Sequence, residues 1–419
     1  MTAVEVPESP ERRTPAPAGR RRVSLPVRYM LTAAAAMLLL AITRAVTDQT
    51  PMTAPGTFSS AIELAMPIAL AGLGGLWAER AGVVNIGLEG MMILGTWFGA
   101  WGGIEYGPWW GVALGALGGA VGGLLHAVAT VSFGVDHVIS GVAINILGAG
   151  TARFLTGVAY EGGQTQSPQV PGRIPSFDVP FLGGALDDLA DKHWFLVSDV
   201  ASLLTAVTHN VSWLVIIGLA LFPLTYWILW RTPVGLRLRS VGEDPSAAES
   251  LGVNVYRMKY LAVVVSGALA GLAGATLIYV FARQFQDGQT NGRGFIGLAA
   301  VVFGNWRPGG LLAGAALFGF TDALQSQQDS VAHGLLLFVS LLVAAIGARL
   351  LARREGKRAV AALVVSLLVL VVWSGTERIP NQLIPVTPHI TTLLVLVFAA
   401  QHLRMPAADG VPYRKGGGK

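Results

Sequence analysis

Twelve apolar segments divide this chain, and they constrain its fold more than any other feature. They lie near residues 30–46, 58–78, 88–105, 109–131, 137–157, 210–230, 259–282, 292–305, 308–325, 332–350, 358–375 and 388–403. A helix needs about 20 apolar residues to cross a bilayer, and fewer where protein shields part of it. Only 13% of the 419 residues are charged, whereas soluble domains have about a quarter. We therefore predict an all-α, polytopic transmembrane helical bundle of about 12 spans.

Two stretches of the chain repeat each other in weakened form. Residues 87–103 (GLEGMMILGTWFGAWGG) and 294–310 (GFIGLAAVVFGNWRPGG) share glycines at their first and fourth positions and a final glycine pair. The heptapeptides 69–75 (ALAGLGG) and 268–274 (ALAGLAG) precede them in the same order. If successive spans alternate in direction, the copies run oppositely, and an inverted internal repeat with glycine-interrupted spans is typical of a transport pathway. Chance similarity between small-residue helices is the alternative.

The distribution of charge predicts an orientation in the membrane. Basic residues cluster in segments 231–259, 349–358 and 404–419, whereas the loop 158–209 is mainly acidic. Cytoplasmic loops carry an excess of lysine and arginine, so we predict that both termini are cytoplasmic and that the loop 158–209 is external. Basic residues at membrane edges also account for the net charge of +5, so no nucleic-acid partner is predicted.

The N-terminal 27 residues differ in composition from the rest of the chain. They are rich in proline and arginine and have few large apolar side chains. Such a segment buries too little apolar surface to fold. We predict a disordered cytoplasmic arm over residues 1–27, followed by an uncleaved first span.

Regularly spaced glycines predict where helices pack closely. Gly115, Gly119 and Gly123 recur every fourth residue in one span, and Gly267 and Gly271 do so in another. Small residues at this spacing share a helix face and let two backbones approach. This pattern indicates packing and carries no functional information by itself.

The basic loop 231–258 contains signals for a short helix. Asp244 is suited to cap a helix, and Pro245 follows at the first helical position, where a missing N–H is tolerated. Residues 246–251 favour a helix, and Gly252 is suited to end it. The adjacent alanines 247 and 248 would form a small, smooth surface for docking in another subunit. An ordinary solvated connector is the alternative.

The same loop resembles the coupling loop of ATP-binding-cassette (ABC) importer permeases, through the run GEDPSAAESLGV at 242–253. The branch it resembles serves nucleosides and simple sugars beside lipoprotein receptors. Further resemblances are ERAGVVNIGLEG at 79–90, SGVAIN at 140–145, GRGFIGLA at 292–299 and GVPYRKG at 410–416. Together they cover most of residues 58–325 and 379–417, but not the N-terminal arm.

The resemblance implies a permease domain over residues 28–417, in the plasma membrane, that moves a nucleoside or simple sugar. It implies three partners, namely a separate ABC ATPase subunit, a second permease subunit that is identical or homologous, and a substrate-binding lipoprotein. The residues expected to contact the ATPase are Gly242, Glu243, Pro245, Ala247, Ala248, Gly252 and Val253. The chain has no phosphate-binding loop of the G-x-x-x-x-G-K-[ST] type, so ATP would be hydrolysed by the partner. No cofactor, metal or enzymatic activity is predicted for the chain itself.

The resemblance also exposes a difference. Permeases of this branch have about ten spans, and here two further apolar segments lie between residues 332 and 375. Because they form a pair, they leave the C-terminus on the cytoplasmic side. We predict an inserted hairpin, whose role the sequence does not indicate.

Four residues within or beside the spans are candidates for the substrate pathway: Asn85, Glu89, Asn145 and Phe295. Polar groups inside a membrane usually face the bundle interior, and an amide offers donors and an acceptor to a nucleoside. Hydrogen bonding between helices is the alternative role for the polar three.

Other polar residues favour structural roles. His126 lies beside a glycine packing face, Asp136 and His137 are placed to cap a span, and Glu79 with Arg80 is an expected cytoplasmic anchoring pair.

Two other function classes are alternatives to an ABC permease. An ion-coupled secondary transporter would also have inverted repeats, but Glu89 and Asp322 form no paired ion relay in the sequence, and the docking loop would be unexplained. A membrane enzyme acting on lipid would need a convergent acid, base and nucleophile, which the sequence does not offer.

Overall fold

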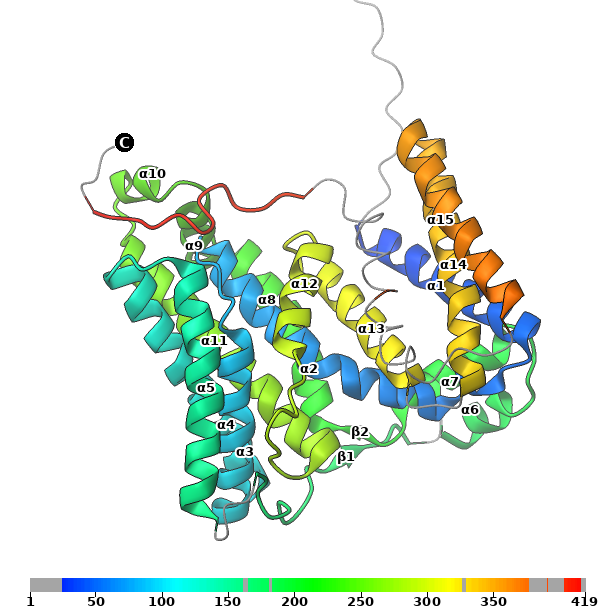
Figure 1. The fold of residues 1–419 in the computed structure, drawn as a ribbon, viewed down its shortest axis with the longest axis horizontal. Helices are drawn as coiled ribbons and strands as arrows, with labels where there is room; N and C mark the ends of the chain where they lie inside the picture. The colour runs from blue at the N-terminus through cyan, green and yellow to red at the C-terminus, as the bar shows by residue number, and fades with distance from the viewer. Residues whose placement is uncertain are drawn as a thin grey trace, which may run out of the picture.

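The apolar segments form helices in the computed structural model, and the helices pack side by side (Figure 1). The structure describes residues 25–160, 165–180, 183–325, 329–376, 390 and 403–415. Its elements are α1 (Leu25–Thr47), η1 (Thr50–Thr53), α2 (Pro55–Arg80), α3 (Leu88–Tyr106), α4 (Pro108–Ala127), η2 (Val128–Ser132), α5 (His137–Ala159), β1 (Ser176–Phe177), α6 (Gly183–Ala190), α7 (Val197–Thr208), β2 (Val211–Ser212), α8 (Trp213–Arg231), α9 (Pro233–Glu243), α10 (Pro245–Ser250), α11 (Val255–Thr276), η3 (Leu277–Ala282), α12 (Arg293–Phe303), α13 (Pro308–Gln325), α14 (Asp329–Ala352) and α15 (Gly356–Gly375).

The helices confirm a polytopic membrane protein. Within the described residues, 8 helices are long and apolar enough to cross a membrane: α1, α2, α4 with η2, α5, α8, α11 with η3, α14 and α15. Helices α3, α12 and α13 occupy three further predicted segments. The last predicted segment, 388–403, lies outside the described residues apart from 390 and 403. A total of about 12 spans therefore stays a prediction.

Some elements differ from the sequence expectations. Residues 1–24 of the predicted arm lie outside the described residues, and residues 25–27 already belong to α1. The predicted external loop contains α6 and α7, and the predicted coupling loop contains α9 before α10. Short helices in connecting segments depend on tertiary packing, such as that of α7 on α2 and of α9 on α8 and α11, which local sequence patterns do not reveal.

The two copies of the repeat are interlocked. Helix α2, which carries the first heptapeptide, packs against α12 and α13, whereas α11, which carries the second, packs against α3 and α4. A side chain at Gly72 of α2 would come within 2.7 Å of the Gly297 carbonyl oxygen of α12. The first helix of each copy is thus held by the second and third helices of the other. This exchange of corresponding contacts is the arrangement expected of a structural repeat.

The glycine spacing marks a close helix contact, as predicted. Gly115, Gly119 and Gly123 of α4 face α11, where Gly267 and Gly271 lie opposite. At Gly123 an added Cβ atom would lie 2.6 Å from the Val263 carbonyl oxygen. The backbones of α4 and α11 therefore meet without side chains between them.

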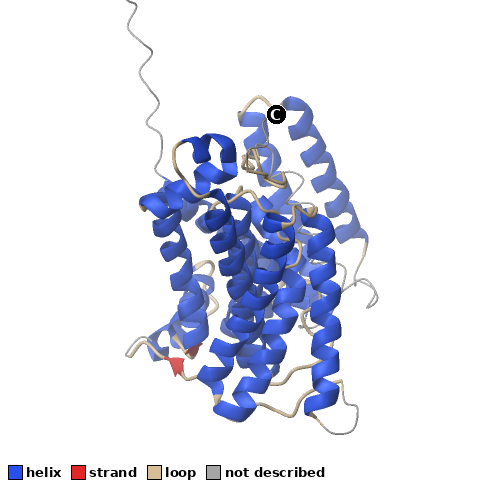
Figure 2. Ribbon diagram, turned by 90° about the vertical axis from the view of Figure 1, so that its left-hand side faces the viewer, coloured by secondary structure: helices blue, strands red, loops and turns tan. Residues whose placement is uncertain are grey.

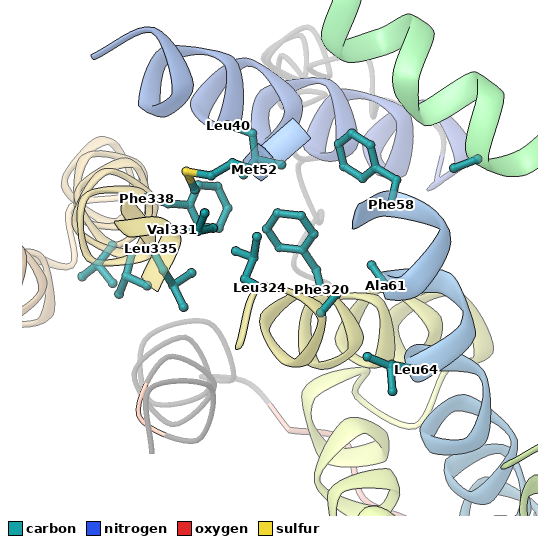
Figure 3. Packing of buried hydrophobic residues seen from close by; sticks show 14 of the residues in the cluster. Leu40, Met52, Phe58, Ala61, Leu64, Phe320, Leu324, Val331, Leu335 and Phe338 are labelled. Carbon is teal, nitrogen blue, oxygen red and sulfur yellow. The ribbon is translucent and has the colours of Figure 1, made fainter. Parts of the chain in front are cut away.

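Helices α1, α14 and α15 form a separate group on one side of the molecule (Figure 1). Figure 3 shows the apolar cluster that joins this group to α2 and α13, with Phe58 stacked on Phe320 at 6.0 Å between ring centroids. Within the predicted hairpin, Ser340 and Ser366 each donate to the other's backbone carbonyl at 2.9 Å. Segment 332–375 is therefore a packed pair of helices.

The polar ends of the bundle carry different structures. Helices α9 and α10 and the C-terminal segment lie at one end, and α6, α7 and the two short strands lie at the other (Figure 1; Figure 2). A buried ion pair at 2.8 Å between Arg44 and Asp199 fastens α7 to α1. Helices α6 and α7 of the acidic loop and helices α9 and α10 of the basic loop thus lie at opposite ends of the bundle.

Candidate functional site at the interrupted helices

A non-helical loop, residues 81–87, separates α2 from α3 inside the bundle. Its backbone groups bond to side chains of other helices: Lys259 Nζ donates to the Gly82 carbonyl at 3.2 Å, and His137 Nδ1 accepts from the Val84 N–H at 3.3 Å. His126 Nε2 lies 3.2 Å from the Val84 carbonyl. Buried backbone groups outside a helix need such partners, because an unpaired buried N–H or C=O group is costly. Loop 81–87 is therefore a fixed part of the fold.

The contacts of His126 select one tautomer of the neutral ring. A carbonyl oxygen only accepts, so Nε2 carries the hydrogen that it donates to Val84. Nδ1 then accepts from the Ser140 hydroxyl at 2.8 Å. His126 is fully buried, and both ring nitrogens are used, which confirms its expected packing role.

Asn145 holds both sides of the junction between this loop and α3. Its Nδ2 donates to the Ile86 carbonyl at 3.0 Å, and its Oδ1 accepts from the Gly90 N–H at 2.7 Å. Asn85 faces α11 instead, where its Nδ2 donates to Ser266 at 2.9 Å. The Asn85 Oδ1 atom is buried without a partner, so one acceptor in this region is unused.

Glu89 joins the two copies of the repeat. Its carboxyl oxygens accept from the Thr290 hydroxyl at 2.6 Å and from the backbone N–H groups of Gly292 at 2.9 Å and Gly294 at 2.7 Å. Those two N–H groups belong to the start of α12. An acidic group at a helix N-terminus is favoured by the helix dipole and by the unbonded N–H groups there. Glu89 on α3 thus caps α12, and Phe295, which is 47% exposed, lies in the same first turn of α12.

The structure brings Glu89, Asn145 and Phe295 together around the meeting point of α3 and α12, while Asn85 lies on the side facing α11. The hydrogen-bonding groups of Glu89 and Asn145 hold the interrupted spans in this conformation. Their role in a substrate path stays a prediction. Lys259, His137 and Ser266 support the loop from distant positions in the chain, so no local pattern in the sequence marks them for this role.

Replacement of Glu89 by alanine is expected to lower the midpoint of thermal unfolding. The N–H groups of Gly292 and Gly294 would lose their acceptor, at roughly 1–3 kcal/mol for each buried donor. The measurement is thermal unfolding of the purified protein, with Glu105→Ala, an exposed acidic residue at the other end of α3, as the matched control. An unchanged midpoint together with lost transport would instead place Glu89 in the path.

Glu79 and Arg80 anchor the end of α2 to the second repeat, as expected. Arg80 Nη2 donates to the Trp306 carbonyl at 2.6 Å, and the Trp306 indole N–H donates to the Glu79 carboxyl group. Trp306 is 3% exposed and follows α12. The ends of α2 and α12 are therefore locked together.

The short helix α10 has the predicted capping pattern. Asp244 Oδ1 accepts from the N–H groups of Ser246 and Ala247, both at 3.0 Å, and Pro245 begins α10. Gly252 ends the turn at a φ of +81°, which favours glycine. The sequence prediction of this helix is confirmed.

The surface of α10 differs from the one expected from sequence. Of the seven predicted contact residues, Glu243, Ala247 and Gly252 are exposed, Pro245 and Val253 are half-buried, and Gly242 and Ala248 are buried. Ala248 packs in a cluster with Val241 and Val255. Leu251, which is not among the seven predicted contact residues, is 85% exposed just after α10. The exposed residues, with Leu251 as the largest, form what we call the docking face: Glu243, Ala247, Leu251 and Gly252.

Comparison with known proteins gives consistent matches. The family model described as branched-chain amino acid transport system / permease component matches residues 57–346. The guanosine ABC transporter permease protein of Bacillus subtilis is 35% identical over 359 residues, which are 84% of this chain and 94% of the relative. A nucleoside ABC transporter permease protein of Lactococcus lactis is 32% identical over 356 residues, 83% of this chain and 93% of the relative. A putative glucose ABC transporter permease protein of Haloferax volcanii is 36% identical over 287 residues, 67% of this chain and 80% of the relative. No solved structure matches the chain.

Proposed function

The chain belongs to the family of branched-chain amino acid transport system permease components, and from this we propose that it is the membrane subunit through which an ABC importer moves nucleosides. Members of this family are multi-pass proteins of the plasma membrane and transporter components rather than enzymes, and they work with an ABC ATPase and a substrate-binding partner. The observation that carries the substrate class is the similarity to guanosine and nucleoside permeases over more than nine-tenths of their length. Simple sugars are the second candidate, because a glucose permease is also similar.

We infer that the partner ATPase binds the docking face of α10. The helix is capped at both ends, lies at one polar end of the bundle and presents Leu251 to solvent (Figure 1). Leu251 is 85% exposed, so its side chain is free to contact another protein. A lipoprotein receptor at the opposite end and a second permease subunit would complete the transporter.

The substrate path is proposed to run past the meeting point of α3 and α12. Two interrupted helices from an inverted repeat meet there, at Glu89 and Gly294. Such junctions are typical of substrate sites near the membrane midplane. Phe295, which is 47% exposed, would offer an aromatic face to a neutral polar substrate, whereas Asn85 is buried against α11 and would line the path only if α11 moved away.

The proposed orientation places the acidic loop outside and both termini inside. Because the chain has no cysteine, single cysteines report topology without background. We expect an impermeant thiol reagent to label Ser176→Cys in intact cells, and Lys357→Cys, in the first turn of α15, only after the membrane is ruptured. Both positions are exposed. The reverse pattern would overturn the orientation.

Reconstituted transport tests the proposed function. The permease, its ATPase and its receptor in proteoliposomes are expected to accumulate radiolabelled guanosine when ATP is supplied, with competition by other nucleosides and not by glucose. Competition by glucose alone would assign the sugar. Uptake driven by an ion gradient without ATP would overturn the proposal.

A further inference from the structure

The C-terminal segment runs across the same end of the bundle as the docking helix. It is drawn in red in Figure 1, next to α9 and α10. The Ala408 N–H donates to the Gly242 carbonyl at 2.9 Å, and the Ala407 N–H donates to the Glu243 carboxyl group at 3.3 Å. This part of the segment therefore holds the junction between α9 and α10.

Tyr413 extends the contact to α10 itself. Its hydroxyl donates to the carboxyl group of Glu249, which lies on α10, and its ring lies 5.8 Å from that of Tyr256 at the start of α11. A hydrogen bond to a carboxyl group is stronger than one between neutral groups when the carboxyl is ionised. Tyr413 thus ties α10 to α11 from outside the connecting turn.

The same segment reaches the interrupted loops of both repeats. The Arg404 N–H donates to Asn305 Oδ1 at 2.7 Å, in the turn after α12. The Ala408 carbonyl lies against Gly82 of loop 81–87, where an added Cβ atom would be 3.0 Å away. Gly82 has a φ of +76°, a conformation that favours glycine, and a side chain at this position would prevent the close approach.

Asp409 lies between these contacts. Burial raises the pKa of Asp409 to about 7, and the nearby Lys259 ammonium and the Gly410 backbone N–H oppose this rise. Lys259 in turn donates to the Gly82 carbonyl. The segment is therefore packed into the loop region as well as bonded along its edge.

We propose that residues 404–413 form a strap that transmits movement of α10 to the two interrupted spans, with Tyr413 as a positioning residue for α10. The inference rests on the proposed role of α10 as the ATPase contact. α10 has only six residues and little contact of its own with the spans. The strap bonds α10 and the turn after α12, and it packs on loop 81–87. A displacement of α10 by the ATPase therefore acts on both copies of the repeat at once.

The test compares import per ATP hydrolysed in proteoliposomes for Tyr413→Phe, Tyr413→Ala and Glu249→Gln. Removal of the Tyr413 hydroxyl breaks its hydrogen bond to Glu249, so the strap is held less firmly against α10. We expect import per ATP to fall in Tyr413→Phe and to fall further in Tyr413→Ala. In the double variant Tyr413→Phe/Glu249→Gln, import per ATP should be no lower than in the more affected single variant, because both substitutions remove the same hydrogen bond. Tyr106→Phe, which removes a hydroxyl from an exposed tyrosine at the far end of α3, is the matched control.

The outcomes separate the strap from the proposed function. Wild-type ratios in both Tyr413 variants, or losses that only follow a lower thermal midpoint, would overturn the strap. If Tyr413→Ala does not insert, Tyr413→Phe decides, because it keeps the ring beside Tyr256. If the wild-type protein does not import nucleosides with ATP, the proposed function is wrong and the strap falls with it. If Leu251→Asp abolishes import but the Tyr413 variants import normally, only the strap is wrong.

Discussion

Replacement of Leu251 by aspartate is expected to abolish ATP-driven import while the protein still folds and inserts. Leu251 is 85% exposed at the polar end of the bundle, so the substitution removes no contact within the chain. A buried apolar anchor at a protein interface contributes about 2 kcal/mol or more, and an unpaired charge in its place adds a desolvation cost. Binding of the ATPase should therefore weaken by at least about 30-fold.

The measurement is co-purification of the ATPase subunit together with ATP-dependent uptake. Leu251→Met keeps the apolar contact and is expected to behave as wild type. Full uptake in Leu251→Asp would show that the docking face lies elsewhere. Substitutions at Ala248 or Gly252 are less direct tests, because Ala248 is buried within the chain and Gly252 has a positive φ. Bulky residues at either position would also change the shape of α10.

Replacement of Gly119 by valine is expected to prevent formation of the native bundle. An added side chain would collide with backbone atoms of Gly267 and Gly271 on α11. Backbone cannot move aside as a flexible side chain does, so the cost should exceed the roughly 1–3 kcal/mol typical of overpacked cores. The two helices would have to separate along their whole contact.

The yield of monodisperse protein and its thermal unfolding midpoint measure this effect. Gly150→Val on α5 is the matched control, since nothing lies within 4 Å of a side chain added there. It makes the same chemical change in another spanning helix and is expected to be neutral. Equal behaviour of the two variants would show that the contact between α4 and α11 is not required for folding.

The sequence by itself determined the features that depend on local chemistry. Apolar segments of sufficient length predict helices wherever they occur, and α1 to α5, α8 and α11 lie where expected. Asp244 and Asp136 cap their helices as predicted, because a cap needs only a short side chain beside the first free N–H groups. The glycine spacing also predicted a close helix contact, although not which helix lies opposite.

The tertiary structure alone decided which partner each polar group has. From the sequence, Glu89 could contact either substrate or another helix. In the structure it bonds to the N-terminus of α12, some two hundred positions away in the chain. The supports of loop 81–87 come from α4, α5 and α11, which share no local signal with it. Ala248 and Leu251 are both apolar and lie three residues apart, yet one is 2% and the other 85% exposed. Burial depends on what packs against a helix. The neighbours of α10 are α9, α11 and the C-terminal strap, and only folding brings the strap to α10.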